Sequence, residues 1–65
     1  MKYSEIIKDL MIENKLTQQK MAEILQVNQT TISQWLLAKK KPSFDNIVSI
    51  YTHFGITPNE LLGIE

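Results

Sequence analysis

Hydrophobic positions recur along most of the chain at the three- and four-residue spacing of an α-helix. The first predicted helix covers about residues 3–14, and its apolar side chains form one stripe: Tyr3, Ile6, Ile7, Leu10 and Met11. A second, short helix is expected to begin after Thr17, which is a good N-cap residue. Its buried face is expected to hold Met21, Ala22 and Leu25. The first 25 residues therefore predict two amphipathic helices joined by a short polar loop.

A third helix is predicted over residues 29–37, with Asn28 placed to cap it. Ile32, Trp35 and Leu36 share one face of this helix, so we expect Trp35 to lie in the core or at its rim. The opposite face is polar apart from one leucine, and it carries Thr30, Ser33, Gln34 and Leu37. The third helix therefore turns a mainly polar edge to solvent.

Two more helices are predicted before the end of the chain. The fourth follows Ser43, ends at Gly55 and carries helically spaced apolar residues: Phe44, Ile47, Val48, Tyr51 and Phe54. We expect its three aromatic side chains to lie in the core. A short fifth helix is predicted from Thr57, Pro58 and Glu60, which together form an N-terminal signature.

These elements predict one all-α domain over residues 1–65, since neither a strand pattern nor a repeat occurs. A chain this short buries only about 60% of the surface that its unfolded form exposes. With no cysteine to form a disulfide, helix packing must supply the stability. Small Ala22 allows the second and third helices to cross closely, as in a helix-turn-helix.

The charges are balanced overall but unevenly distributed. Seven lysines offset seven acidic residues, and there is no arginine. A net charge of zero counts against nucleic-acid binding, which usually needs a basic face. However, no acidic residue occurs between Ile24 and Phe44, and Lys39, Lys40 and Lys41 lie together within that segment. The segment that contains the third helix is therefore locally basic.

Several classes of protein are disfavoured. No apolar run approaches the roughly 20 residues that span a bilayer, and we expect a soluble cytoplasmic protein without membrane contact. No nucleophile lies at a useful spacing from a base, and neither a metal-ligand cluster nor a phosphate-binding glycine loop is present. The lone His53 is expected on the surface. We therefore expect no enzyme activity, no metal or other cofactor, and no small-molecule ligand.

A specific string of residues supports a narrower interpretation. It consists of Leu16-Thr17-Gln18, Met21-Ala22, Leu25-Gln26-Val27-Asn28, Thr31-Ile32-Ser33-Gln34-Trp35 and Ala38-Lys39-Lys40-Lys41-Pro42-Ser43. This string resembles the Cro/C1-type (Xre-like) helix-turn-helix family of phage repressors and bacterial regulators, over about residues 7–62. The resemblance implies a compact five-helix, lambda-repressor-like domain with its motif at about residues 17–37. It also implies a transcriptional regulator, of the repressor kind, that binds operator DNA as a homodimer.

The resemblance also assigns roles to individual residues. Gln29, Thr30 and Gln34 match positions that face base edges in the major groove. A glutamine can bind adenine through two hydrogen bonds, and a threonine methyl can contact a thymine methyl. Because the chain has no arginine, bidentate arginine–guanine contacts are excluded. We therefore expect a half-site read mainly at A·T pairs. The expected phosphate contacts are Gln18, Asn28, Ser33, Lys39, Lys40 and Lys41.

Three departures from the family pattern carry structural predictions. Gln26 and Ala38 stand where glycine is common, so the first turn is either left-handed, at a cost of about 1 kcal/mol, or reshaped. Met11 and Leu36 match positions where the family often has an arginine–glutamate pair. Replacing a buried ion pair by two hydrophobic residues is often neutral or stabilising. We therefore expect Met11 and Leu36 to touch as a structural pair.

Two alternatives stay open. The chain could keep this fold but bind another protein, as an antitoxin-like module would; DNA binding must weaken with salt, which separates the two. A group of apolar residues near the C-terminus could form a dimer contact or simply close the core: Ile50, Ile56, Leu61, Leu62 and Ile64.

Overall fold

A computed structural model describes residues 2–62 of the chain. Its helices are α1 (Lys2–Glu13), α2 (Gln18–Leu25), α3 (Gln29–Leu36), α4 (Phe44–Phe54) and α5 (Pro58–Leu62). Within residues 2–62 there is no strand, so the prediction of a five-helix, all-α fold is confirmed. The helix bounds differ from the predicted ones by about one residue.

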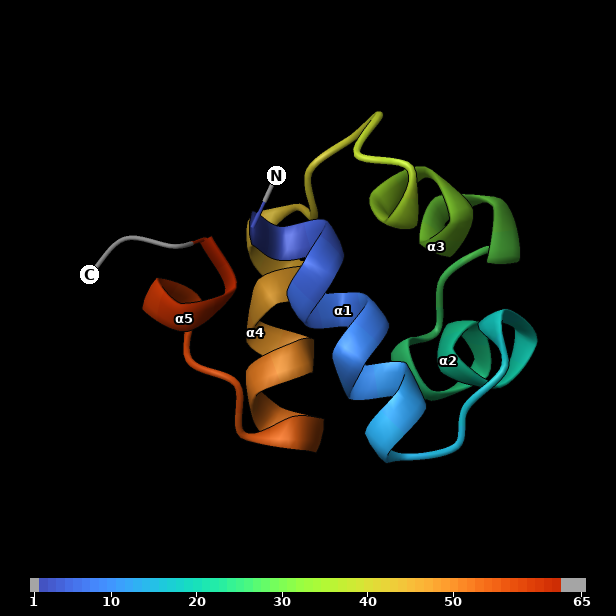
Figure 1. Ribbon diagram of the computed structural model, residues 1–65, viewed down its shortest axis with the longest axis horizontal. Helices are drawn as coiled ribbons and strands as arrows, with labels where there is room; N and C mark the ends of the chain where they lie inside the picture. Colours follow the sequence, from blue (N-terminus) through green and yellow to red (C-terminus); the bar gives the residue numbers. More distant parts are fainter. Residues whose placement is uncertain (1, 63–65) are drawn as a thin grey trace.

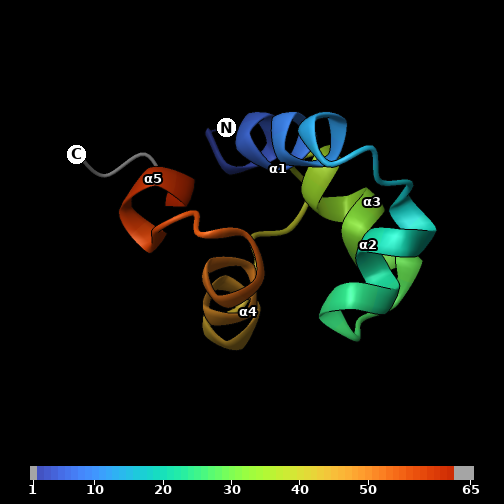
Figure 2. The same ribbon diagram turned by 90° about the horizontal axis from the view of Figure 1, so that it is seen from below.

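Helix α1 lies between two pairs of helices (Figure 1). Helices α2 and α3 lie on one side of it and α4 and α5 on the other, as the view turned by 90° also shows (Figure 2). Both α3 and α5 pack against α1, while α2 packs against α3 and α4 against α5. The molecule measures 30 × 23 × 21 Å.

The core forms where the apolar stripes of all five helices meet. Its buried members are Tyr3, Ile7, Leu10, Met11, Met21, Ala22, Leu25, Ile32, Trp35, Ile47, Ile50 and Leu61. The predicted stripe of α1 is confirmed, with Ile6 only partly buried. Trp35 is 1% exposed and therefore belongs to the core, not to its rim. Large side chains from α1 and α3 thus fix the position of α3 on the domain.

The predicted burial of two aromatic residues on α4 is wrong. Phe44 is 77% exposed and Tyr51 is 52% exposed, whereas Phe54 is partly buried against the core. Ile47 and Ile50 are the buried residues of this helix. The apolar surface of α4 extends over more than one face, and the rest of the domain covers only the face that carries these two isoleucines.

The C-terminal apolar residues that the structure describes close the core. Ile50 and Leu61 are fully buried, and Ile56 is partly buried and packs against the core. The side chain of Leu62 and all of Ile64 lie outside the described part of the structure. The predicted start of α5 is confirmed by the Glu60 backbone N–H, which donates to Thr57 Oγ1 at 3.2 Å. For Ile50 and Leu61, core closure is the role that the structure supports.

Candidate nucleic-acid interface

Helices α2 and α3 form a helix-turn-helix whose two helices begin at the same edge of the molecule (Figure 1). Thr17 caps α2, since its hydroxyl accepts the backbone N–H of Lys20 at 3.0 Å. Asn28 occupies the N-cap position of α3 in an extended conformation, but its side chain makes no cap hydrogen bond. The predicted position of this cap is therefore right, and the predicted side-chain bond is not formed.

The turn between α2 and α3 keeps the left-handed geometry that usually favours glycine. Gln26 has φ 57° and ψ 47°. The N–H of Val27 then donates to the carbonyl of Ala22 at 3.0 Å, which closes the end of α2. Of the two geometries considered for this turn, the left-handed one is present. Ala38 takes the same kind of conformation after α3, with φ 58°.

The outer edge of α3 is presented to solvent. Gln29 and Thr30 are exposed, and Gln34 is half-buried. Ile32 and Trp35 lie on the opposite side of the same helix and are buried. Because α3 is anchored through these two large side chains, its polar edge is held in one fixed orientation.

The candidate phosphate contacts surround this edge. Gln18 is the first residue of α2 and is half-buried, Asn28 is exposed, and Ser33 is half-buried. The three lysines Lys39, Lys40 and Lys41 are exposed in the linker after α3. A backbone hydrogen bond holds the start of this linker against the last turn of α3, since the N–H of Lys39 donates to the carbonyl of Gln34 at 2.9 Å. The lysine side chains therefore stay close to the C-terminal end of α3.

The electrostatic environment of the edge is simple. Lys20 and Glu23 form an ion pair on α2 at 3.8 Å, with both side chains about 60% exposed. Such an exposed pair contributes little to stability and is screened by salt. Among the described residues, no group of three metal-ligating side chains comes together, and no helix is long and apolar enough to cross a membrane. The chemistry available at this edge is hydrogen bonding and positive charge.

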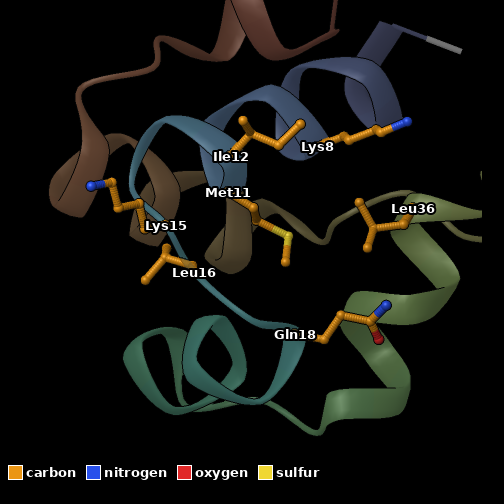
Figure 3. Close-up of a pocket in the computed structure, with 7 residues that line it drawn as sticks. All are labelled: Lys8, Met11, Ile12, Lys15, Leu16, Gln18 and Leu36. Atoms are coloured by element: carbon orange, nitrogen blue, oxygen red, sulfur yellow. The ribbon is translucent and has the colours of Figure 1, made fainter.

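A solvent-open cavity of about 350 Å³ lies between α1, the start of α2 and the end of α3 (Figure 3). Its lining residues are Lys8, Met11, Ile12, Lys15, Leu16, Gln18 and Leu36. Met11 is buried and Leu36 is partly buried, and both line this cavity from different helices. Their direct contact stays a prediction.

The same cavity brings together residues that sequence reasoning missed. Lys8 and Lys15 line it with Gln18, which begins α2. Lys8 comes from α1 and Lys15 from the following loop, so only the folding of α1 against α2 and α3 places them there. Their spacing in the sequence offers no signal of this proximity. Both lysines are exposed, and their ammonium ends point away from Gln18 (Figure 3).

Comparisons with known proteins agree with this geometry. A family model described as a helix-turn-helix domain matches residues 5–63. The HTH-type transcriptional activator BcrR of Enterococcus faecalis is 35% identical over 65 residues, which are 100% of this chain and 32% of that protein. The chain thus spans about a third of the length of this relative. No solved structure matches the chain significantly. The chain belongs to the helix-turn-helix domain family.

Proposed function

We propose that the chain binds double-stranded DNA in a sequence-specific manner and regulates transcription, with α3 in the major groove. The observation that carries this proposal is the polar edge of α3, where Gln29 and Thr30 are exposed while Trp35 is buried behind them. The major groove of B-DNA admits an α-helix, and each base pair presents a distinct hydrogen-bonding pattern there. A helix that is anchored on one face and polar on the other suits this groove.

The proposed readout divides the contacts by chemistry. Gln29, Thr30 and Gln34 contact base edges, and the two glutamines bind adenine through paired hydrogen bonds. The remaining candidates bind phosphates and set the register of the protein on DNA: Gln18, Asn28, Ser33, Lys39, Lys40 and Lys41. Because no arginine is present, the operator is expected to be read mainly at A·T pairs.

Two finer parts of the proposal come from the resemblance to Cro/C1-type proteins. The first is binding as a homodimer on two half-sites. The second is repression, by occupying an operator within a promoter. The similar protein from Enterococcus faecalis is named an activator, so the sign of regulation needs its own test. A reporter gene is placed behind a promoter that carries an operator selected from random DNA by binding to this chain. Expression of the chain should lower the reporter activity, and a rise in reporter activity would contradict repression.

A binding titration against salt tests the DNA-binding proposal itself. The affinity of the chain for a DNA fragment is measured at several salt concentrations. The logarithm of this affinity should fall linearly with the logarithm of the salt concentration. The slope reports the number of phosphates that the protein neutralises. Failure to bind any duplex at low salt would contradict the proposal and favour a protein-interaction module of the antitoxin kind.

A further inference from the structure

The solvent-open cavity beside α1 has an apolar part that comes from three segments of the chain (Figure 3). Met11 and Ile12 belong to α1, Leu16 to the loop before α2, and Leu36 to the end of α3. Ile12 is 65% exposed, so one large apolar side chain of the lining stands largely in solvent. Contiguous exposed apolar surface with a polar rim is typical of interaction sites.

The charged residues that line this cavity are Lys8 and Lys15, and the lining contains no acidic residue. Figure 3 shows the two lysine side chains extending in opposite directions, with Ile12 between them. Within residues 2–62, neither of these lysines forms an ion pair. The cavity therefore offers an apolar centre between two unpaired positive charges.

We propose that this cavity binds a segment of another protein whose apolar side chains lie between acidic residues. The apolar side chains of the segment pack on Met11, Ile12 and Leu36. Carboxylates on either side of them pair with Lys8 and Lys15. An apolar centre with a polar rim is the usual anatomy of a protein–protein interface. This binding is independent of the DNA-binding function proposed above.

The size and shape of the cavity favour a protein segment over a free small molecule. Its volume of about 350 Å³ lies at the lower end of the roughly 300–1,000 Å³ range of small-molecule pockets. Such pockets enclose most of their ligand. This cavity is instead open to solvent, and Ile12 is exposed beside it. It suits a few apolar side chains of a partner whose remaining surface lies outside the cavity.

The apolar lining also distinguishes this surface from the DNA-binding edge. Gln18 is the one lining residue that is also a candidate phosphate contact, and the ammonium ends of Lys8 and Lys15 point away from it (Figure 3). A DNA backbone carries a dense row of charged phosphates, so it pairs with lysines but gains little from an exposed isoleucine. An acidic protein segment with apolar side chains matches both the lysines and Ile12.

A selection from random peptides displayed on phage tests the proposal without a known partner. The library is bound to the immobilised chain at low salt, and the enriched peptides should carry apolar residues between acidic ones. One enriched peptide is then synthesised and titrated into the chain with labelled methionine methyl groups. The NMR signal of Met11, which lines the cavity, should shift, whereas that of Met21, which is fully buried in the core, should not.

Three results of this experiment would overturn the proposal. The first is that no peptide is enriched. The second is enrichment of peptides without acidic residues. The third is a bound peptide that leaves the signal of Met11 unchanged, because such a peptide occupies another surface, such as the exposed lysines after α3.

A pair of variants tests the apolar contact. Ile12→Thr keeps the branched Cβ but removes apolar surface, and it should weaken binding of the selected peptide at least about fivefold. Val48→Thr is the matched control, since Val48 is also an exposed β-branched residue but lies on α4. This control should leave the affinity for the peptide unchanged. Equal affinities of Ile12→Thr and the wild type would contradict the proposal.

A second set of variants tests the charges. Lys8→Gln and Lys15→Gln should each weaken peptide binding and make it less sensitive to salt, because a charge at the rim of an interface acts on the association rate and its salt dependence. Asn59→Asp lowers the net charge by the same amount on α5 and is the control. An equal effect of all three variants would mean that the peptide responds to net charge alone and would overturn the assignment of the two lysines.

Operator binding by the same variants separates this proposal from the DNA-binding one. Ile12→Thr should bind DNA as the wild type does. A loss of operator affinity in Lys8→Gln or Lys15→Gln that exceeds the loss in Asn59→Asp would assign these lysines to DNA phosphates and overturn the peptide site. If the chain binds no DNA but its peptide binding depends on Ile12, the peptide site stands and the proposed DNA-binding function fails.

Discussion

At the scale of single residues, the backbone carries strain where glycine would carry none. Lys15, Gln26 and Ala38 all have φ values of 55–58°, in the left-handed region. A side chain in this conformation costs roughly 1–2 kcal/mol. The turn at Gln26 persists because burial of Ala22 and Leu25 holds α2 against the core. Packing on both sides of this turn therefore determines its geometry, against the preference of the residue itself.

Replacing Gln26 by glycine should stabilise the domain. Because the left-handed conformation costs glycine no steric energy, Gln26→Gly should gain about 1 kcal/mol and raise Tm by roughly 4–8 °C. Thermal unfolding followed by circular dichroism measures the change. Gln19→Gly, within the right-handed part of α2, is the control and should lower Tm. A lower Tm for Gln26→Gly would show that the side chain makes a stabilising contact.

The proposed contacts of α3 with base edges lead to a prediction about specificity. Gln29→Ala and Gln34→Ala should each weaken binding to the selected operator by about 1–3 kcal/mol and relax the preference at one base position. A competition assay with single-base variants of the operator measures both effects. Asn59→Ala, an exposed change on α5, should alter neither. Equal loss of affinity for every sequence would instead assign these glutamines to phosphate contacts.

At the scale of the elements, the sequence predicts the position of each helix along the chain better than it predicts which face of the helix is buried. The spacing of Ile32 and Trp35 correctly indicates the buried face of α3, and with it the exposure of Gln29 and Thr30. The apolar residues of α4 extend around more than one face, so spacing alone does not decide which of them face inward. That choice depends on which faces of α4 the other helices cover, and contacts distant in sequence set it.

The same limit applies to parts of the candidate site. The sequence places Gln18 at the start of α2, as the structure has it. It gives no sign that Lys8 and Lys15 line a cavity with Gln18, because the proximity arises from the packing of α1. Likewise, periodicity left two roles open for Ile50 and Leu61, and only their complete burial favours the core.

A double-mutant cycle tests the predicted pair between α1 and α3. Met11→Arg or Leu36→Glu alone introduces an unpaired charge beside the cavity that both residues line, and each should destabilise the domain by about 1–3 kcal/mol. Together they should restore much of the loss, since neighbouring opposite charges couple. Urea unfolding of the four proteins gives the coupling energy. Additive losses would mean that the two side chains do not touch.

At the scale of the whole molecule, the distribution of charge matters more than the total of zero. The sequence between Ile24 and Phe44 contains no acidic residue, and its three adjacent lysines are exposed next to the end of α3. Acidic residues occur instead on α1, α2, α4 and α5: Glu5, Asp9, Glu13, Glu23, Asp45 and Glu60. Such an asymmetric molecule can approach DNA in a preferred orientation although its net charge is zero.

A salt titration of one lysine variant tests this orientation. If Lys40 neutralises a phosphate, Lys40→Gln should reduce the slope of log affinity against log salt by about 0.9. Asn59→Asp is a matched control, since it also lowers the net charge by one but lies on α5, across α1 from α2 and α3 (Figure 1). An equal effect of both variants would indicate a response to net charge alone.

The central claim, that the edge of α3 reads DNA, is tested most directly by selecting bound duplexes from a random pool. We expect enrichment of inverted half-sites whose centres lie about 10 bp apart or a multiple of that. The positions read by Gln29 and Gln34 should be A·T pairs, and selection with the Gln29→Ala variant should lose its preference at one of them. An absence of any enriched sequence, or an invariant G·C core opposite both glutamines, would contradict the account.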